Sequence, residues 1–229
     1  MELQANALYR HDAVGRLLSV NTLSHRPAPR VFVGRTLEGN VVRFRYDLPD
    51  DLAQQLAALI QAEPLAGTYD ELERSPGYLD EAIRLLAEYG PVEAVWHGPA
   101  WTFPAQLASH DTPTRPVDRS NSEVVVRWFP WLIEELEDSW PCLVVREDGD
   151  AVAVCRSVRT TADAVEAGVE TVEAYRDRGY ASAVVRAWAR EVRSAGLVPL
   201  YSTSWDNLAS RGVARKLGLR LYGADLNIT

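Results

Sequence analysis

The sequence predicts an α+β protein, with a mixed, twisted central sheet flanked by helices in its second half and a smaller α+β region in its first half. Two strand-like runs meet at Gly149, as in an antiparallel hairpin. A later run, 181–196, has apolar residues at the helical spacing i, i+3, i+4, i+7, i+8, i+11 and stops at a glycine. Strand-like and helix-like runs occur in both halves, which favours a layered fold.

The first half begins with a segment whose pattern predicts a β-hairpin, at residues 31–48. Apolar and polar residues alternate there around a Glu-Gly-Asn turn. Two helix-like segments follow, at 49–64 and 75–90, each with an apolar stripe. The segment 92–104 is aromatic and strand-like. None of these segments carries a motif of known chemistry.

A change in composition divides the chain. Residues 109–122 are rich in Pro, Ser, Asp and Thr and poor in apolar side chains, which predicts a loop or linker. We therefore expect an N-terminal α+β region of unknown role at 1–110, a linker at 111–122 and a second domain at 123–229.

The second half has the clearer pattern. Residues 124–138 look helical, wholly or in part, with an interruption at Pro130. The remaining expected elements are, in order, strands at 142–148, 151–160 and 164–173, a helix at 181–196, a strand at 197–205, a short helix at 206–218 and a strand at 219–229.

Composition limits the classes of function. The 229 residues carry 24 basic and 32 acidic side chains, a net charge of -8, which argues against a nucleic-acid-binding surface. No run approaches eighteen apolar residues, and the N-terminus lacks the pattern of a secretory signal, so we expect a cytoplasmic protein that is not in the membrane. Cys142 and Cys155 are then expected to be buried thiols rather than a disulfide. The four histidines lack metal-ligand spacing, so no metal site is expected.

The most informative stretch is Tyr175–Ser182, "YRDRGYAS", which joins an expected strand to an expected helix. A helix start presents N–H groups without internal partners and the positive end of the helix dipole, which together suit an anion such as phosphate. Gly179 allows a close approach of backbone, and Arg176 and Arg178 add positive charge. The alternative is an ordinary strand–helix turn with a solvated arginine pair.

At this point the chain resembles the GNAT superfamily of acyl-CoA N-acyltransferases, in a bacterial subgroup with an extra N-terminal region. The family loop [QR]-x-x-G-x-[GA] fits Arg176-Asp177-Arg178-Gly179-Tyr180-Ala181, and the helix-opening Asn of the second family block fits Asn207, with Leu217-Gly218-Leu219 at that helix's end. The resemblance covers about Val124 to Thr229.

The resemblance implies a site for acetyl-CoA as co-substrate. The loop amides would bind the pyrophosphate, the backbone of the preceding strand would bind the pantetheine, and the Asn would contact the cofactor arm, although it could equally be only a helix cap. The residues implied to bind the cofactor are Val169, Glu170, Thr171, Arg176, Asp177, Arg178, Gly179, Tyr180, Ala181, Ser182 and Asn207.

The catalytic groups are less clear. Glu166 and Glu170 are the candidate general bases; they share a strand face unless a bulge at Gly168 breaks the alternation. The alternative for these carboxylates is an ion pair with Arg156 or Arg159. The family often has a Tyr, acting as general acid, seven residues after the Asn.

That position is Ala214 here, which leaves Tyr201, Ser202 and Ser204 as substitutes for the acid. The segment 127–132, "RWFPWL", lies where the family's acceptor-lining helices lie, and it could shape that pocket or simply pack in the core.

The expected function is N-acetyl transfer from acetyl-CoA to a primary amine, on a small molecule or a protein. The alternatives are a non-catalytic acyl-CoA-binding sensor or subunit and a structural partner-binding protein. No nucleic-acid or membrane partner is expected, and the sequence does not indicate the acceptor or the oligomeric state.

Overall fold

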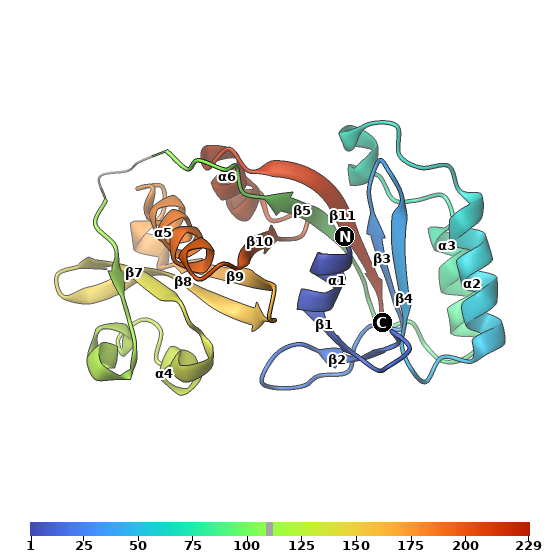
Figure 1. The fold of residues 1–229 in the computed structure, drawn as a ribbon, viewed down its shortest axis with the longest axis horizontal. Coiled ribbons are helices and arrows are strands. Elements are labelled where there is room, and N and C mark those ends of the chain that lie inside the picture. Colours follow the sequence, from blue (N-terminus) through green and yellow to red (C-terminus); the bar gives the residue numbers. More distant parts are fainter. Residues whose placement is uncertain (109–111) are drawn as a thin grey trace. The chain divides into compact units, whose positions relative to one another are not determined.

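The computed structural model describes residues 1–108 and 112–229 (Figure 1). The chain forms two compact units, each made of segments that are distant in the sequence. The first unit consists of Met1–Trp101, Ser202–Leu208 and Leu221–Thr229, and the second of Thr102–Tyr201 and Ala209–Arg220. The two units are described separately below. The division at 1–110, 111–122 and 123–229 stays a prediction.

The first unit is built on strands in the order β4-β3-β11-β5. These are β3 (Val31–Arg35), β4 (Asn40–Phe44), β5 (Val95–Thr102) and β11 (Arg220–Ile228). The predicted hairpin is confirmed, because β3 and β4 pair antiparallel from Val31↔Phe44 to Arg35↔Asn40. On its other side β3 pairs antiparallel with β11, the last strand of the chain.

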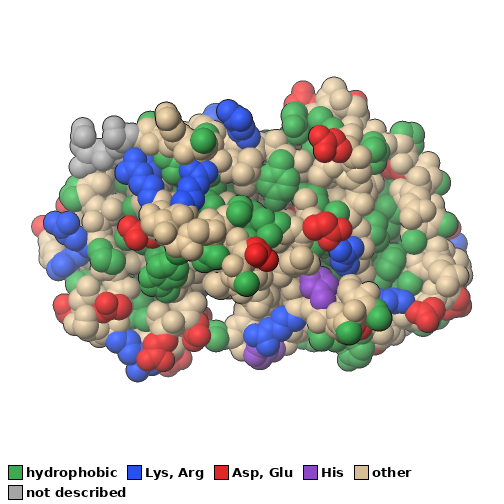
Figure 2. Space-filling model, viewed as in Figure 1, with side chains coloured by type: hydrophobic (Ala, Val, Ile, Leu, Met, Phe, Trp, Pro, Cys, Tyr) green, Lys and Arg blue, Asp and Glu red, His purple; other side chains and the backbone are tan. Residues whose placement is uncertain are grey.

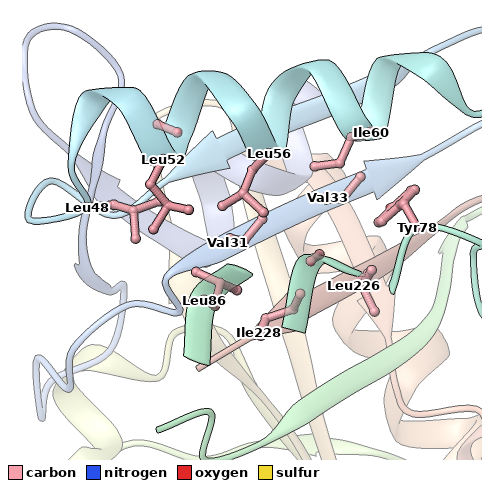
Figure 3. Packing of buried hydrophobic residues seen from close by; sticks show 12 residues of the cluster. Val31, Val33, Leu48, Leu52, Leu56, Ile60, Tyr78, Leu86, Leu226 and Ile228 are labelled. Carbon is pink, nitrogen blue, oxygen red and sulfur yellow. The ribbon is translucent and has the colours of Figure 1, made fainter. Parts of the chain in front are cut away.

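Helices cover both faces of β3. α2 (Asp50–Ala62) and α3 (Leu79–Ala87), both predicted, enclose the cluster drawn in Figure 3, in which side chains of α2 point at Val31 and Val33. Phe32 points the opposite way, as alternation requires, and packs with residues of α1 (Glu2–Leu8) and of the hairpin β1 (Tyr9–His11) and β2 (Leu17–Val20). A short 3₁₀ helix, η1 (Tyr69–Glu73), lies between α2 and α3 in the chain.

The second unit contains a mixed sheet in the order β10-β9-β8-β7-β6. Its strands are β6 (Arg115–Pro116), β7 (Cys142–Glu147), β8 (Asp150–Thr160), β9 (Ala164–Thr171) and β10 (Val198–Ser202). β6 to β9 pair antiparallel, whereas β9 and β10 pair parallel. The predicted α+β class, with a mixed sheet flanked by helices, is confirmed.

One face of this sheet is covered by α5 (Tyr180–Ser194), whose Trp188 donates through its indole N–H to the Ser157 hydroxyl of β8 at 3.1 Å. The other face is covered by η2 (Arg119–Val125), α4 (Leu132–Glu135) and η3 (Leu136–Asp138). Two further helices complete the chain, η4 (Glu173–Tyr175) and α6 (Leu208–Lys216).

The described part of the expected linker, residues 112–122, is not a plain loop. Residues 109–111 lie outside the described residues, but β6 and the start of η2 fall within the expected linker. Asp118 caps η2: its carboxylate accepts from the Ser120 N–H at 2.8 Å, and Asn121 completes a capping box. Asp118 and Asn121, of the residue types that suggested a loop, thus cap a helix here.

The cysteine prediction is confirmed. Cys142 and Cys155 are both buried and free. Burial raises the pKa of the Cys142 thiol to about 12 and raises that of Cys155 well above its ordinary value. Within the described residues, the structure has no helix with the length and apolar character needed to span a membrane.

Candidate functional site

The strand–loop–helix junction lies within the second unit. β9 ends at Thr171, η4 follows, and α5 begins at Tyr180. The loop between them turns through two left-handed positions, Asp177 at φ 62° and Gly179 at φ 83°. Glycine adopts this conformation without the steric penalty of a side chain, so Gly179 has a clear local role.

The start of α5 has unused hydrogen-bond donors. The first bond of the helix runs from the Ala183 N–H to the Gly179 carbonyl at 3.1 Å, and no side chain caps the helix. The N–H groups of Tyr180, Ala181 and Ser182 therefore have no acceptor within the described residues. A left-handed turn leading into a free helix start is the backbone arrangement that binds phosphate groups.

The two loop arginines are exposed, as expected. The Arg178 guanidinium lies over the Tyr175 ring, 5.0 Å from its centroid, and donates to the Ala174 carbonyl at 3.3 Å. Tyr180 donates its hydroxyl to Glu147, and this hydrogen bond raises the pKa of the tyrosine. The loop thus holds one arginine against its own backbone and leaves Arg176 extended into solvent.

Arginines further along α5 hold a neighbouring segment of the chain. Figure 2 shows basic side chains gathered over α5, and two of them bind the segment that follows β5. Arg190 donates to the Leu107 carbonyl at 3.2 Å, and Arg193 donates to the Phe103 carbonyl at 2.9 Å and to the Pro104 carbonyl at 2.8 Å. These contacts fasten residues 103–107 onto α5.

β9 loses its parallel neighbour halfway along. β10 pairs with β9 only from Ala164 to Glu166, opposite Val198–Leu200, whereas β9 continues to Thr171. Along Ala167–Thr171 the edge that faces away from β8 has no strand partner in the described part of the chain. Val169, Glu170 and Thr171, implied to bind pantetheine, lie on this open edge.

Glu166 and Glu170 share one face of β9. The irregularity in this part of the sheet lies in β8, between Ser157 and Arg159, so the bulge that Gly168 could have marked does not form there. Gly168 pairs regularly with Arg156. Glycine is needed there for space, because a Cβ would lie 2.3 Å from Val158 Cγ1. The side chain of Glu166 is buried, at 1% exposure, and that of Glu170 is exposed.

The ion pairs suggested for these carboxylates do not form. Arg156 is paired instead with Glu135 of α4, at 2.9 Å. Within the described residues, neither Arg156 nor Arg159 forms an ion pair with Glu166 or Glu170. Arg156 and Arg159 are therefore not ion-pair partners of these glutamates, and this does not assign a catalytic role to either.

The substitutes for the missing acid are not well placed. Tyr201 is 2% exposed, and its hydroxyl donates to the Ser210 carbonyl of α6 at 3.4 Å. Burial raises its pKa far above the ordinary value. Ala214 is buried on α6, and Ser202 and Ser204 are half-buried. A structural role fits Tyr201 best.

Asn207 belongs to the first unit, where it is exposed and directly precedes α6. The segment that leads to it is tied to β5: the Trp205 indole N–H donates to His97 Nε2 at 3.2 Å, and the Thr203 N–H donates to the Pro99 carbonyl at 3.4 Å. The sequence did not predict this contact, because His97 and Trp205 are far apart in the chain and leave no local pattern.

The sequence likewise did not predict the environment of Arg156. Its only signal is an arginine inside the apolar run of β8. No group of three or more His, Cys, Asp or Glu side chains in the described ranges is arranged to hold a metal ion.

Comparison with known proteins matches residues 142–224 to the family model for GNAT acetyltransferases. A search of the curated proteins finds no match. Among solved structures, a GCN5-related N-acetyltransferase-like protein from Streptococcus suis is 17% identical over 88% of this chain and 85% of its own, with a TM-score of 0.50. This likeness shows a shared fold.

Two further solved structures are similar. A GNAT-family acetyltransferase structure from Novosphingobium aromaticivorans is 21% identical over 60% of this chain, with a TM-score of 0.48. The matched part spans 65% of that protein. An acetyltransferase from Colwellia psychrerythraea is 11% identical over 90% of this chain and 83% of its own, with a TM-score of 0.49.

Proposed function

Because residues 142–224 belong to the GNAT acetyltransferase family, we propose that the protein transfers an acetyl group from acetyl-CoA to a primary amine. The observation that carries this proposal is the start of α5, where three adjacent N–H groups without acceptors follow the left-handed Gly179. A diphosphate satisfies such donors and interacts favourably with the helix dipole.

The cofactor would lie along the open edge of β9. Pyrophosphate would bind the amides from Arg178 to Ser182, with Arg176 and Asp177 flanking it. The pantetheine amides would take the place of a strand neighbour beside Val169–Thr171. Asn207 would contact the cofactor arm, as the family resemblance implies.

The reaction needs few side chains. The amine loses a proton, and its nitrogen attacks the thioester carbonyl carbon to form the C–N bond. The C–S bond then breaks, and the CoA thiolate takes up a proton, so that the products are the amide, CoA and one released proton. Glu166 or Glu170 would accept the ammonium proton, directly or through water. Since Ala214 supplies no acid, water would protonate the thiolate.

A second candidate is an acyl-CoA-binding sensor or subunit without turnover. The observation that favours it is Ala214, which is buried and has no hydroxyl. Both candidates require CoA binding, so turnover alone separates them. The acceptor amine would belong to either a small molecule or a protein.

The first test is the melting temperature of the protein with and without millimolar CoA or acetyl-CoA. Because a ligand of the native state stabilises it by mass action, both compounds should raise the melting temperature. An unchanged melting temperature in a folded sample would contradict the transferase and the sensor together. Release of free thiol from acetyl-CoA, dependent on an added amine, would then support the transferase over the sensor.

A further inference from the structure

The sheet face of β8 that packs against α4 carries a guanidinium that is held in a fixed position. Arg156 of β8 lies with its guanidinium carbon 4.4 Å from the centroid of the Trp131 ring. Its Nε and Nη2 both donate to one oxygen of Glu135, Oε2, at 3.3 and 2.9 Å. An aromatic face and a carboxylate thus orient the group, which keeps 14% of its side-chain surface exposed.

Glu135 uses only one edge of this guanidinium. Arginine has five N–H donors, and its Nη1–Nη2 end can take both oxygens of a second carboxylate. Arg156 Nη1 donates no hydrogen bond within the described residues. The Nη1 end of the fork therefore has donors that no group in the described part of the chain accepts.

Gly168 places this free end against β9. A Cβ at residue 168 would lie 2.8 Å from Arg156 Nη1, so the guanidinium occupies the space that a side chain would take. Gly168 directly precedes Val169, where the open edge of β9 begins to serve the cofactor in the proposed function. A carboxylate on Arg156 would thus lie next to the reacting thioester.

The Glu170 carboxylate is close to the Arg156 guanidinium along the sheet. Glu170 is paired with Val154, two residues before Arg156, so Glu170 and Arg156 are diagonal neighbours on the same sheet face. Glu170 is exposed and forms no ion pair within the described residues. The face therefore offers one cationic and one anionic group at the diagonal spacing of a sheet, about 7–8 Å.

We propose that the acceptor is an amine that also carries a carboxylate a few bonds away, such as an α-amino acid. Its carboxylate binds the free end of Arg156, and its amino group lies between Arg156 and Glu170, beside the thioester. This inference rests on the proposed function and specifies the acceptor of the same site. An acceptor with several amines and no carboxylate would instead be repelled by Arg156.

The test uses three acceptors with one side chain: an α-amino acid, its α-amide and the amine left after decarboxylation. With saturating acetyl-CoA, wild type should prefer the amino acid in kcat/KM. Arg156→Gln should lower kcat/KM for the amino acid by roughly tenfold to a hundredfold, mainly through KM, as expected for the loss of a charge-assisted hydrogen bond. The same substitution should leave the α-amide nearly unaffected.

Two variants separate recognition from stability. Arg146→Gln is the matched control, because Arg146 is exposed and, among the described residues, binds only the Gly149 carbonyl of the β7–β8 turn. It should act like wild type. If Arg156→Gln does not fold, Arg156→Lys is the second variant. It keeps the charge but not the forked donors, and should retain part of the preference for the amino acid over its α-amide.

Glu135→Gln should have the opposite effect. The glutamine keeps an oxygen that can orient Arg156 but removes the negative charge beside it, so KM for the amino acid should fall while the α-amide is unchanged. A role of Arg156 only in fastening α4 would change all three acceptors alike in both variants.

Each outcome has a distinct meaning. Equal use of the three acceptors by wild type, or an equal loss for all three in Arg156→Gln, overturns the inference and leaves acetyl transfer intact. CoA binding without turnover of any acceptor overturns the acetyltransferase proposal and this inference with it.

Discussion

At the residue scale, the proposed CoA-binding loop depends on Gly179. Gly179 at φ 83° both permits the turn and leaves the helix start open to a ligand. Gly179→Val should weaken CoA binding strongly, because a β-branched side chain blocks the approach to the N–H groups and disfavours the left-handed backbone. The measurement is CoA affinity by calorimetry.

Gly149→Val is the matched control for Gly179→Val. Gly149 is also left-handed, at φ 95°, but lies in the β7–β8 turn with open space around it. Both variants should lose about 1–2 kcal/mol of stability, but only Gly179→Val should lose CoA affinity. Unchanged affinity in folded Gly179→Val would show that the loop does not hold the pyrophosphate.

The two carboxylates of β9 can also be tested by single substitutions. One of Glu166→Gln and Glu170→Gln should lower kcat by roughly tenfold or more, as for loss of a general base, with CoA affinity nearly intact. Glu173→Gln, at an exposed position in η4, is the control. Near-normal kcat in both variants from about pH 6 to 9, the range in which a tuned base titrates, would mean that the amine is deprotonated in solution.

At the scale of elements, His97 links β5 to the segment before α6. Its ring accepts from the Trp205 N–H and hydrogen-bonds to the Leu72 carbonyl. Burial, reinforced by the positive charge of Arg35, lowers the pKa of His97 to about 4. The neutral ring is therefore part of the folded first unit.

This lowered pKa predicts a dependence of stability on pH. Between about pH 6.5 and pH 4 the unfolded chain binds a proton at His97 that the folded chain excludes, so stability falls as pH falls through this window. The loss should be at most about 3 kcal/mol. Urea unfolding of wild type and His97→Gln at several pH values would measure it, and the variant should have the flatter profile. Parallel profiles for wild type and His97→Gln would contradict the assignment.

At the scale of the whole molecule, the first unit depends on the last strand of the chain. β11 pairs with β3 over five residue pairs, from Ala224↔Arg35 to Ile228↔Val31, and brings Leu226 and Ile228 into the core of that unit. Figure 3 shows both side chains among those of α3 and β3. The fold of this unit thus requires both ends of the chain.

We therefore expect a fragment of residues 1–110 to be unfolded or much less stable than the same residues in the full chain, because β3 would have a bare edge and an incomplete core. Circular dichroism with urea titration is the measurement. Leu226→Ala in the full chain should cost about 2–5 kcal/mol, the usual range for such a cavity. A cooperative, stable 1–110 fragment would show that β11 is dispensable.

The sequence by itself determined the main strands and the long helix of the second unit and the strand–loop–helix junction between β9 and α5. Hydrophobic periodicity depends on residues a few positions apart, so β7, β8, β9 and α5 could be recognised locally. The loop Arg176–Ser182 could be recognised for the same reason, since the strand, turn and helix start that form it are contiguous in the chain. The short α1 and the hairpin β1–β2 carry too few residues for a periodic signal and were missed.

Only the tertiary structure decided which distant segments meet. The pairing of β11 with β3, the bulge in β8 rather than β9, and the placing of Arg156 between Trp131 and Glu135 all depend on packing between segments far apart in the sequence. Local pattern carries no information on such partners, because the free energy that selects them comes from burial and pairing summed over the whole fold. The loop could therefore be predicted from sequence, whereas the surroundings of Glu166, Glu170 and Arg156 could not.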